Sequence, residues 1–80
     1  MPSPPATIDV MLSTLNATDV GSLDSVVEKL RLVQCELDAL GQEELSRRTA
    51  DTIAALRRGD MAEFRRGRAF LQSKIGHLRP

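Results

Sequence analysis

The strongest constraint on the fold is a run of apolar residues spaced alternately three and four positions apart in the middle of the chain. This spacing places every member on one face of an α-helix, and it is the pattern of helices that pack in pairs. The members are Leu23, Val26, Leu30, Val33, Leu37 and Leu40, and Val20 and Val27 widen the stripe. The sequence therefore predicts an amphipathic helix that must bury this face, which favours an all-α fold.

A shorter helix is predicted before this stripe, at about residues 6–16. Apolar residues recur there at i, i+3, i+4 and i+7, namely Ile8, Met11, Leu12 and Leu15. We expect residues 1–5 to be disordered, although Ser3 and the two prolines after it also suit a helix start. Residues 17–21 form a connector, and Thr18, Asp19 or Ser22 could cap the next helix.

Gly41 leaves two interpretations of the central region open. It could end the helix as a left-handed terminal residue. Alternatively, a single helix could run from about residue 22 to 58 with a possible kink at Gly41, because the residues after it offer no good N-cap. Glu43 and Glu44 also precede Arg47 and Arg48 at the favourable i,i+4 spacing. The apolar phase slips between Leu40 and Leu45, but we predict the continuous helix.

The boundary at Gly59 is the clearest in the chain. Gly59 is suited to ending a helix, and Asp60 followed three residues later by Glu63 resembles a capping box. A last helix is therefore predicted over residues 61–78, folded back on the central helix as an antiparallel hairpin. Its apolar stripe is Met61, Phe64, Leu71, Ile75 and Leu78. Arg68 interrupts this stripe, so it either extends its charged end to solvent or pairs with a carboxylate across an interface.

The chain is predicted to be one small domain that self-associates. Its 80 residues include two Phe and no Trp or Tyr, so the core must be aliphatic and thin. The apolar stripes also exceed what three helices of one chain can cover. We expect a homodimeric helical bundle, with Leu23, Val26, Val27, Leu30, Val33, Leu37 and Arg68 as interface candidates.

Charge is balanced overall but divided along the sequence. Residues 1–46 hold eight acids against two bases, a net charge of −6, whereas residues 47–80 hold nine bases against three acids, a net charge of +6. The two halves could face each other within the fold or across a dimer, or the basic half could face an acidic partner. The basic surface candidates are Arg47, Arg48, Arg57, Arg58, Arg65 and Arg66.

No residue set in the sequence specifies a reaction, a metal or a cofactor. Cys35 is the only cysteine and His77 the only histidine, which is too few ligands for an ordinary zinc site. Only His77 could serve as the base of a Ser/His/Asp triad, and no such arrangement is evident in the sequence. No apolar run approaches the length of a membrane span. We therefore expect a cytoplasmic protein that is not an enzyme and that needs no cofactor, small-molecule substrate or membrane.

Two short motifs have simpler structural explanations. Arg58, Gly59 and Asp60 spell the tripeptide that integrins bind, but a helix stop followed by a helix start explains all three residues. Residues 51–73 invite comparison with a DNA-binding helix-turn-helix. Arg65 and Arg68 would then occupy positions where that motif buries apolar residues, and the short turn favours an antiparallel hairpin.

Three classes of function remain open. The first is a protein interaction module, such as an adaptor, a regulator or a small chaperone or co-chaperone that acts through helical packing. The second is a nucleic-acid-associated protein that uses the basic C-terminal part of the chain, although no Tyr or Trp is available for base stacking. The third is a structural subunit of a larger assembly. We expect the first, with the chain itself and another protein as partners.

Overall fold

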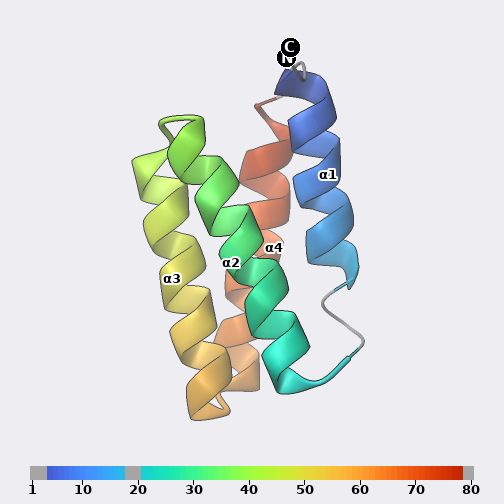
Figure 1. The fold of residues 1–80 in the computed structure, drawn as a ribbon. Helices are drawn as coiled ribbons and strands as arrows, with labels where there is room; N and C mark the ends of the chain where they lie inside the picture. Colours follow the sequence, from blue (N-terminus) through green and yellow to red (C-terminus); the bar gives the residue numbers. More distant parts are fainter. Residues whose placement is uncertain (1–3, 18–20, 79–80) are drawn as a thin grey trace.

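Four α-helices follow one another along the chain in the computed structural model, which describes residues 4–17 and 21–78 and the side chains of residues 8–17 and 21–78. They are α1 (Pro4–Asn16), α2 (Leu23–Ala39), α3 (Glu43–Arg58) and α4 (Met61–Gly76). Each helix runs antiparallel to the one before it (Figure 1). Helix α1 packs on α2 and α4, and α3 packs on the same two helices, so the four form a closed ring with α2 and α4 on one diagonal. The all-α prediction is confirmed, whereas the predicted number of helices is wrong.

The predicted continuous helix over residues 22–58 is broken at Gly41. Helix α2 ends at Ala39, Gly41 adopts a left-handed conformation with φ of 74°, and α3 begins at Glu43. The amide of Gln42 donates to the carbonyl of Leu37 at 2.9 Å, and the amide of Gly41 donates to that of Asp38 at 3.0 Å. These are the two hydrogen bonds of a Schellman turn, which satisfies carbonyls at the end of a helix. The reversal lets the apolar faces of α2 and α3 cover each other, which one straight helix could not do.

The other predicted boundaries lie within a few residues of those observed. Helix α1 begins at Pro4, so residues 4 and 5 are helical rather than disordered, and residues 1–3 lie outside the described chain. Ser22, one of three predicted caps, accepts a hydrogen bond from the amide of Ser25 at 3.2 Å. At the other end, α4 stops at Gly76 rather than at residue 78. Thr18, Asp19 and Val20 lie outside the described residues.

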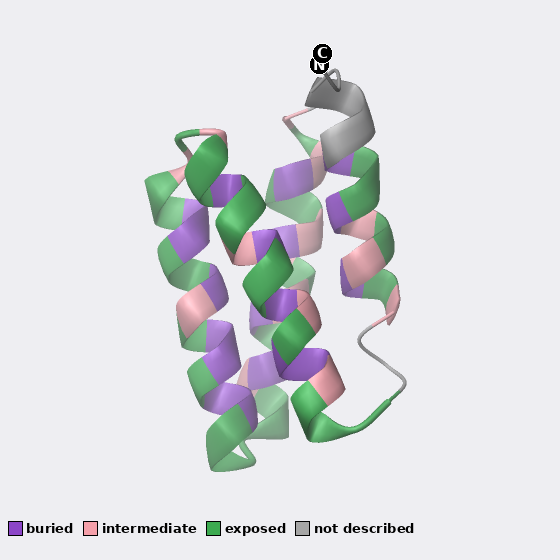
Figure 2. Cartoon of the chain, viewed as in Figure 1, coloured by how far each residue is buried: buried purple, intermediate pink, exposed green. Residues whose placement is uncertain are grey.

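The core runs along the axis of the ring and draws on all four helices (Figure 2). Phe64, Leu71 and Ile75 are buried, as the stripe on the last helix predicts. Two members of the predicted stripes are not core residues, because Leu23 is 52% exposed and Met61 is 44% exposed. The buried apolar residues are Ile8, Met11, Leu15, Val26, Val27, Leu30, Val33, Leu37, Leu45, Ile53, Ala55, Leu56, Phe64, Leu71 and Ile75.

Gly67, rather than Arg68, occupies the position where α4 meets α3. Gly67 is buried, and a Cβ atom built on it would fall on the hydroxyl group of Thr52 in α3. That hydroxyl donates to the carbonyl of Arg48 within its own helix at 2.8 Å, so its polarity is satisfied inside the contact. The stripe of α4 is therefore Phe64, Gly67, Leu71 and Ile75, and the predicted interruption by Arg68 is wrong.

Candidate functional site

The interface residues predicted on the central stripe lie inside a single chain. Val26 and Val27 are each 6% exposed, and Leu30, Val33 and Leu37 are at most 1% exposed. They pack in the same cluster as core residues of α1, α3 and α4. The prediction of a dimer rested on a stripe that one chain could not cover, and four helices cover it. Leu23 remains exposed, at the start of α2.

Arg68 lies half-buried beside an aromatic core residue. Its guanidinium carbon is 5.6 Å from the centre of the Phe64 ring, a distance at which a cation is attracted to the ring face. The stem of Arg68 therefore covers part of the core edge while the side chain remains accessible, which is the extended arrangement that the sequence allowed.

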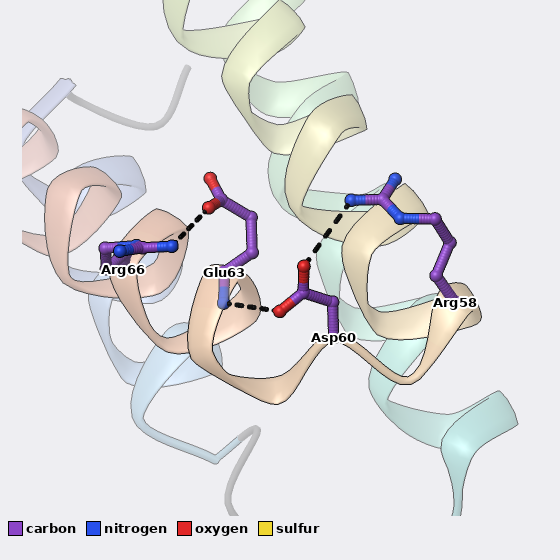
Figure 3. Close-up of polar contacts among 4 residues, drawn as sticks. All are labelled: Arg58, Asp60, Glu63 and Arg66. Carbon is purple, nitrogen blue, oxygen red and sulfur yellow. Dashed lines mark hydrogen bonds and ion pairs between the residues drawn. The ribbon is translucent and has the colours of Figure 1, made fainter.

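The six basic surface candidates are all exposed, and several have local partners. Arg66 forms a 2.7 Å salt bridge with Glu63, as their i,i+3 spacing predicts, and Arg58 lies 4.0 Å from Asp60 (Figure 3). Arg48 places its guanidinium carbon 4.3 Å from the centre of the Phe70 ring. Arg47, Arg57 and Arg65 are exposed without a partner among the described residues. Exposed local pairs of this kind contribute little to stability.

The uneven distribution of charge along the sequence separates acidic and basic residues onto two helices that lie diagonally across the bundle. Helix α2 carries four acids against two bases, and α4 carries four bases against one acid. Because α2 and α4 lie diagonally across the ring, their outer faces do not neutralise each other. The molecule therefore presents an acidic edge along α2 and a basic edge along α4.

An apolar groove remains open between α1 and α2. Val10 is 61% exposed and Leu32 is 59% exposed, and both line the same depression of about 160 Å³. Its other lining residues are Met11, Thr14, Val33 and Glu36. The Thr14 hydroxyl donates to the carbonyl of Val10 at 2.8 Å, so its polarity is satisfied within α1. We call this depression, with its six lining residues, the α1–α2 groove.

Pattern reasoning overlooked Val10 and Leu32 because neither belongs to a core stripe. At the helical angle of 100° per residue, Leu32 lies well to one side of the stripe of α2, and Val10 is similarly displaced from Ile8, Met11 and Leu15. The sequence signal that could have identified them is a large aliphatic residue on the otherwise polar face of each of two successive helices, because the core does not need either residue.

Two carboxylates follow Leu32 along the outer face of α2. Glu28 and Glu36 stand four residues before and four residues after it, so all three lie on one side of the helix. Both carboxylates are exposed, and neither has an ion pair or hydrogen bond within the described chain. Lys29, the nearest cation in sequence to Glu28, instead donates to the carbonyl of Ala17 at 3.2 Å and covers the end of α1.

Two larger depressions are more polar. One, of about 560 Å³, lies where the start of α3 meets the end of α4, and it is lined by Gln42, Glu44, Leu45, Phe70, Lys74, His77 and Leu78. The other, of about 460 Å³, lies between α2 and α3 and includes the exposed Cys35. Cys35 and Asp38 line the second depression together, but no hydrogen bond joins their side chains. No three potential metal-ligating side chains converge anywhere in the described part of the chain.

The Arg58–Gly59–Asp60 sequence forms the α3–α4 turn. Gly59 is left-handed with φ of 77°, and a carboxylate oxygen of Asp60 accepts a hydrogen bond from the amide of Glu63 at 3.1 Å (Figure 3). All three residues thus have roles in ending one helix and starting the next, as the sequence indicates.

The described helices and the known proteins give no further assignment. Within residues 4–17 and 21–78, no helix has the length and apolar character to cross a membrane. No family model, curated protein or solved structure matches the chain.

Proposed function

We propose that this protein is a non-enzymatic interaction module that binds another protein through helical packing at the α1–α2 groove. The observation that supports this proposal is the pairing of Val10 and Leu32 as exposed apolar residues on one depression, in a bundle whose core is otherwise closed. Each side chain leaves more than half of its surface in water. Burial of the pair by a partner would remove apolar surface from water, which is the main driving force of association.

The groove suits a helix better than a compact pocket ligand. Its lining residues come from two antiparallel helices (Figure 1) and recur four positions apart on each, as Val10 and Thr14 on α1 and as Leu32 and Glu36 on α2. An amphipathic helix that lies in such a groove inserts side chains at i, i+3 or i+4. An adaptor, a regulator or a small chaperone that shields a helix of its client could act through packing of this kind.

Site-specific photo-crosslinking in the source cell tests the proposal. A photoreactive residue placed at Leu32 is expected to form a defined protein adduct, and the matched residue at the exposed Ala54 of α3 is not. The adduct should disappear when Val10→Asp is added, because a charge then lies in the groove. Equal adducts from both positions, or none from Leu32, would contradict the proposal.

Self-association through the same face is a distinguishable result. The sequence favours a homodimer, and a second copy could bury Val10 and Leu32 as another protein would. An adduct of twice the chain mass in a purified sample, lost in Val10→Asp, would identify the partner as a second copy. Light scattering at micromolar concentration would then give a dimer rather than the 8.8 kDa monomer.

A nucleic-acid-associated role is the second candidate, since the six arginines on α3 and α4 are all exposed. Phosphate binding would appear as affinity for generic DNA or RNA that falls steeply between about 50 and 200 mM salt. A mobility shift that is abolished by the triple change of Arg47, Arg57 and Arg65 to Ala, with Leu32→Asp as the control, would favour this candidate over the first.

A further inference from the structure

We infer that the partner of the α1–α2 groove is a basic amphipathic helix, whose apolar side chains contact Val10 and Leu32 and whose cations pair with Glu28 and Glu36. This inference rests on the proposed function and adds the chemistry of the partner. It is carried by three residues spaced four positions apart on the outer face of α2, where the exposed Leu32 stands between Glu28 and Glu36, two carboxylates without partners in the described chain.

The spacing on α2 specifies a pattern in the partner. Glu28 and Glu36 are eight residues apart, which is about 12 Å along a helix with a rise of 1.5 Å per residue. A partner helix running alongside α2 meets both carboxylates when its Lys or Arg residues are also about eight positions apart, with a large apolar residue midway. Arginine suits this role best, because its guanidinium can bind a carboxylate through two hydrogen bonds.

The charge of α2 decides between a basic and an acidic partner. Four of the six charged residues on α2 are acids. Lys29, the cation next to Glu28 in the sequence, donates to the Ala17 carbonyl at the end of α1. An acidic helix or an anionic lipid surface would bring like charges against Glu28 and Glu36, which is unfavourable. A basic helix is attracted before contact and is oriented by the same two carboxylates.

A second copy of the chain is a poorer occupant, although it contains the required spacing. Arg66, Phe70 and Lys74 on α4 follow one another at intervals of four. However, Phe70 is half-buried and is covered by Arg48 at 4.3 Å, so little of its ring is available. The α2 and α4 edges also lie on opposite sides of the ring. Pairing them between copies would build an open chain instead of a closed dimer.

Peptide binding to the full chain tests the inference. The probe is a helix-forming peptide with a leucine stripe flanked by lysines, and the matched probe has glutamates in place of those lysines. In fluorescence anisotropy at about 50 mM salt, the lysine peptide is expected to bind and the glutamate peptide is not. Leu32→Asp should abolish binding while the helix content, measured by circular dichroism, remains unchanged because Leu32 is already exposed.

Charge reversal gives the decisive comparison. Glu28→Lys with Glu36→Lys should weaken binding of the lysine peptide about tenfold and should allow the glutamate peptide to bind. The control, Asp38→Lys with Asp51→Lys, makes the same change in net charge at exposed sites outside the groove and should alter affinity less than about twofold. Equal weakening by both pairs would show a non-specific charge effect and would overturn the inference.

The outcomes separate this inference from the proposed function. If the two peptides bind equally well and both require Leu32, the groove binds helices but does not select basic ones, so only the inference fails. If the chain alone dimerises through Leu32, the occupant is a second copy and the inference fails while a binding role remains. If neither peptide binds and the Leu32 crosslink is also absent in cells, both proposals fail.

Discussion

The turns at Gly41 and Gly59 have similar backbone conformations, but the helices that follow them begin differently. At Gly41 and at Gly59, the chain ends a helix with the same pair of hydrogen bonds, and both glycines are left-handed. The α3–α4 turn then starts its next helix with a capped residue, because Asp60 accepts a hydrogen bond from the amide of Glu63. The α2–α3 turn starts with Gln42, which makes no side-chain cap.

This difference shows that the signal that ends one helix is enough to divide the chain into two helices, even when the next helix has no side-chain N-cap. A good N-cap after a glycine strengthens a turn, but its absence does not restore a continuous helix. What decides the break at Gly41 is the combination of a residue that tolerates a positive φ with two apolar faces that must meet. The helix pairs also differ, since α3 and α4 approach closely at Gly67 and Thr52.

The largest effect is expected from Gly67→Ala, which tests whether close packing rather than the Asp60 cap determines the α3–α4 corner. The added Cβ would meet the Thr52 hydroxyl, so α3 and α4 must separate. We expect a loss of about 2–3 kcal/mol in the free energy of unfolding, measured by urea denaturation. The control is Gly76→Ala, where a Cβ meets no atom within 4 Å. A loss at Gly67 no greater than at Gly76 would contradict this packing argument.

Gly41→Ala and Gly59→Ala are expected to destabilise the protein by similar amounts, about 1–2 kcal/mol each. Both residues have φ near 75°, and a Cβ at either position meets no neighbouring atom within 4 Å. The cost therefore comes from the backbone conformation alone. Thermal unfolding of the two variants side by side measures it. A much smaller loss at Gly41 would mean that the α2–α3 turn can adopt another conformation, as the continuous helix would require.

Asp60→Ala removes the element that distinguishes the two turns. The Glu63 amide then loses its acceptor, and we expect a loss of about 1 kcal/mol. Asp60→Asn retains an acceptor oxygen and should keep most of the stability that Asp60→Ala loses. Because asparagine is uncharged, this variant also separates the cap from the exposed contact with Arg58. Urea midpoints of the three proteins would show this order, and equal losses in the alanine and asparagine variants would assign the effect to charge.

Gln42→Asp should make the α2–α3 turn resemble the α3–α4 turn. The new carboxylate could accept from an amide in the first turn of α3 and would interact favourably with the positive end of the helix. The expected gain is about 0.5–1 kcal/mol, the smallest change of the series. Gln42→Ala serves as the control and should be nearly neutral, because Gln42 makes no cap in the first place. No gain from Asp would indicate that the backbone at Gln42 cannot present a cap.

The same comparison explains which parts of the fold could be predicted from the sequence. The α3–α4 turn was predictable because Gly59, Asp60 and Glu63 form a local signal that needs no tertiary information. At Gly41 the local signals conflict, and the pairs Glu43–Arg47 and Glu44–Arg48 favoured continuity. Neither pair forms a salt bridge in the structure, and Arg48 lies over Phe70 instead. The slip of apolar phase before Leu45 was the informative signal.

The candidate site was less predictable than the fold. Periodicity identifies residues that a helix buries, so it assigned Val26, Val27 and Leu30 to an interface when they belong to the core. Whether a stripe is covered within one chain depends on the number of helices, and the break at Gly41 changed that number. Val10 and Leu32 form a groove only because α1 packs beside α2, and no local pattern specifies this contact.

The ring also has a consequence for how the chain folds. Helices α2, α3 and α4 are joined by two tight turns, so their contacts form between segments close in sequence. The ring closes only when α1 meets α4, where the side-chain amide of Gln72 donates to the side-chain oxygen of Asn16 across 56 residues. Contacts at such separation cost more loop entropy than contacts across the two tight turns. We therefore expect α1 to dock last and to exchange its amide hydrogens first.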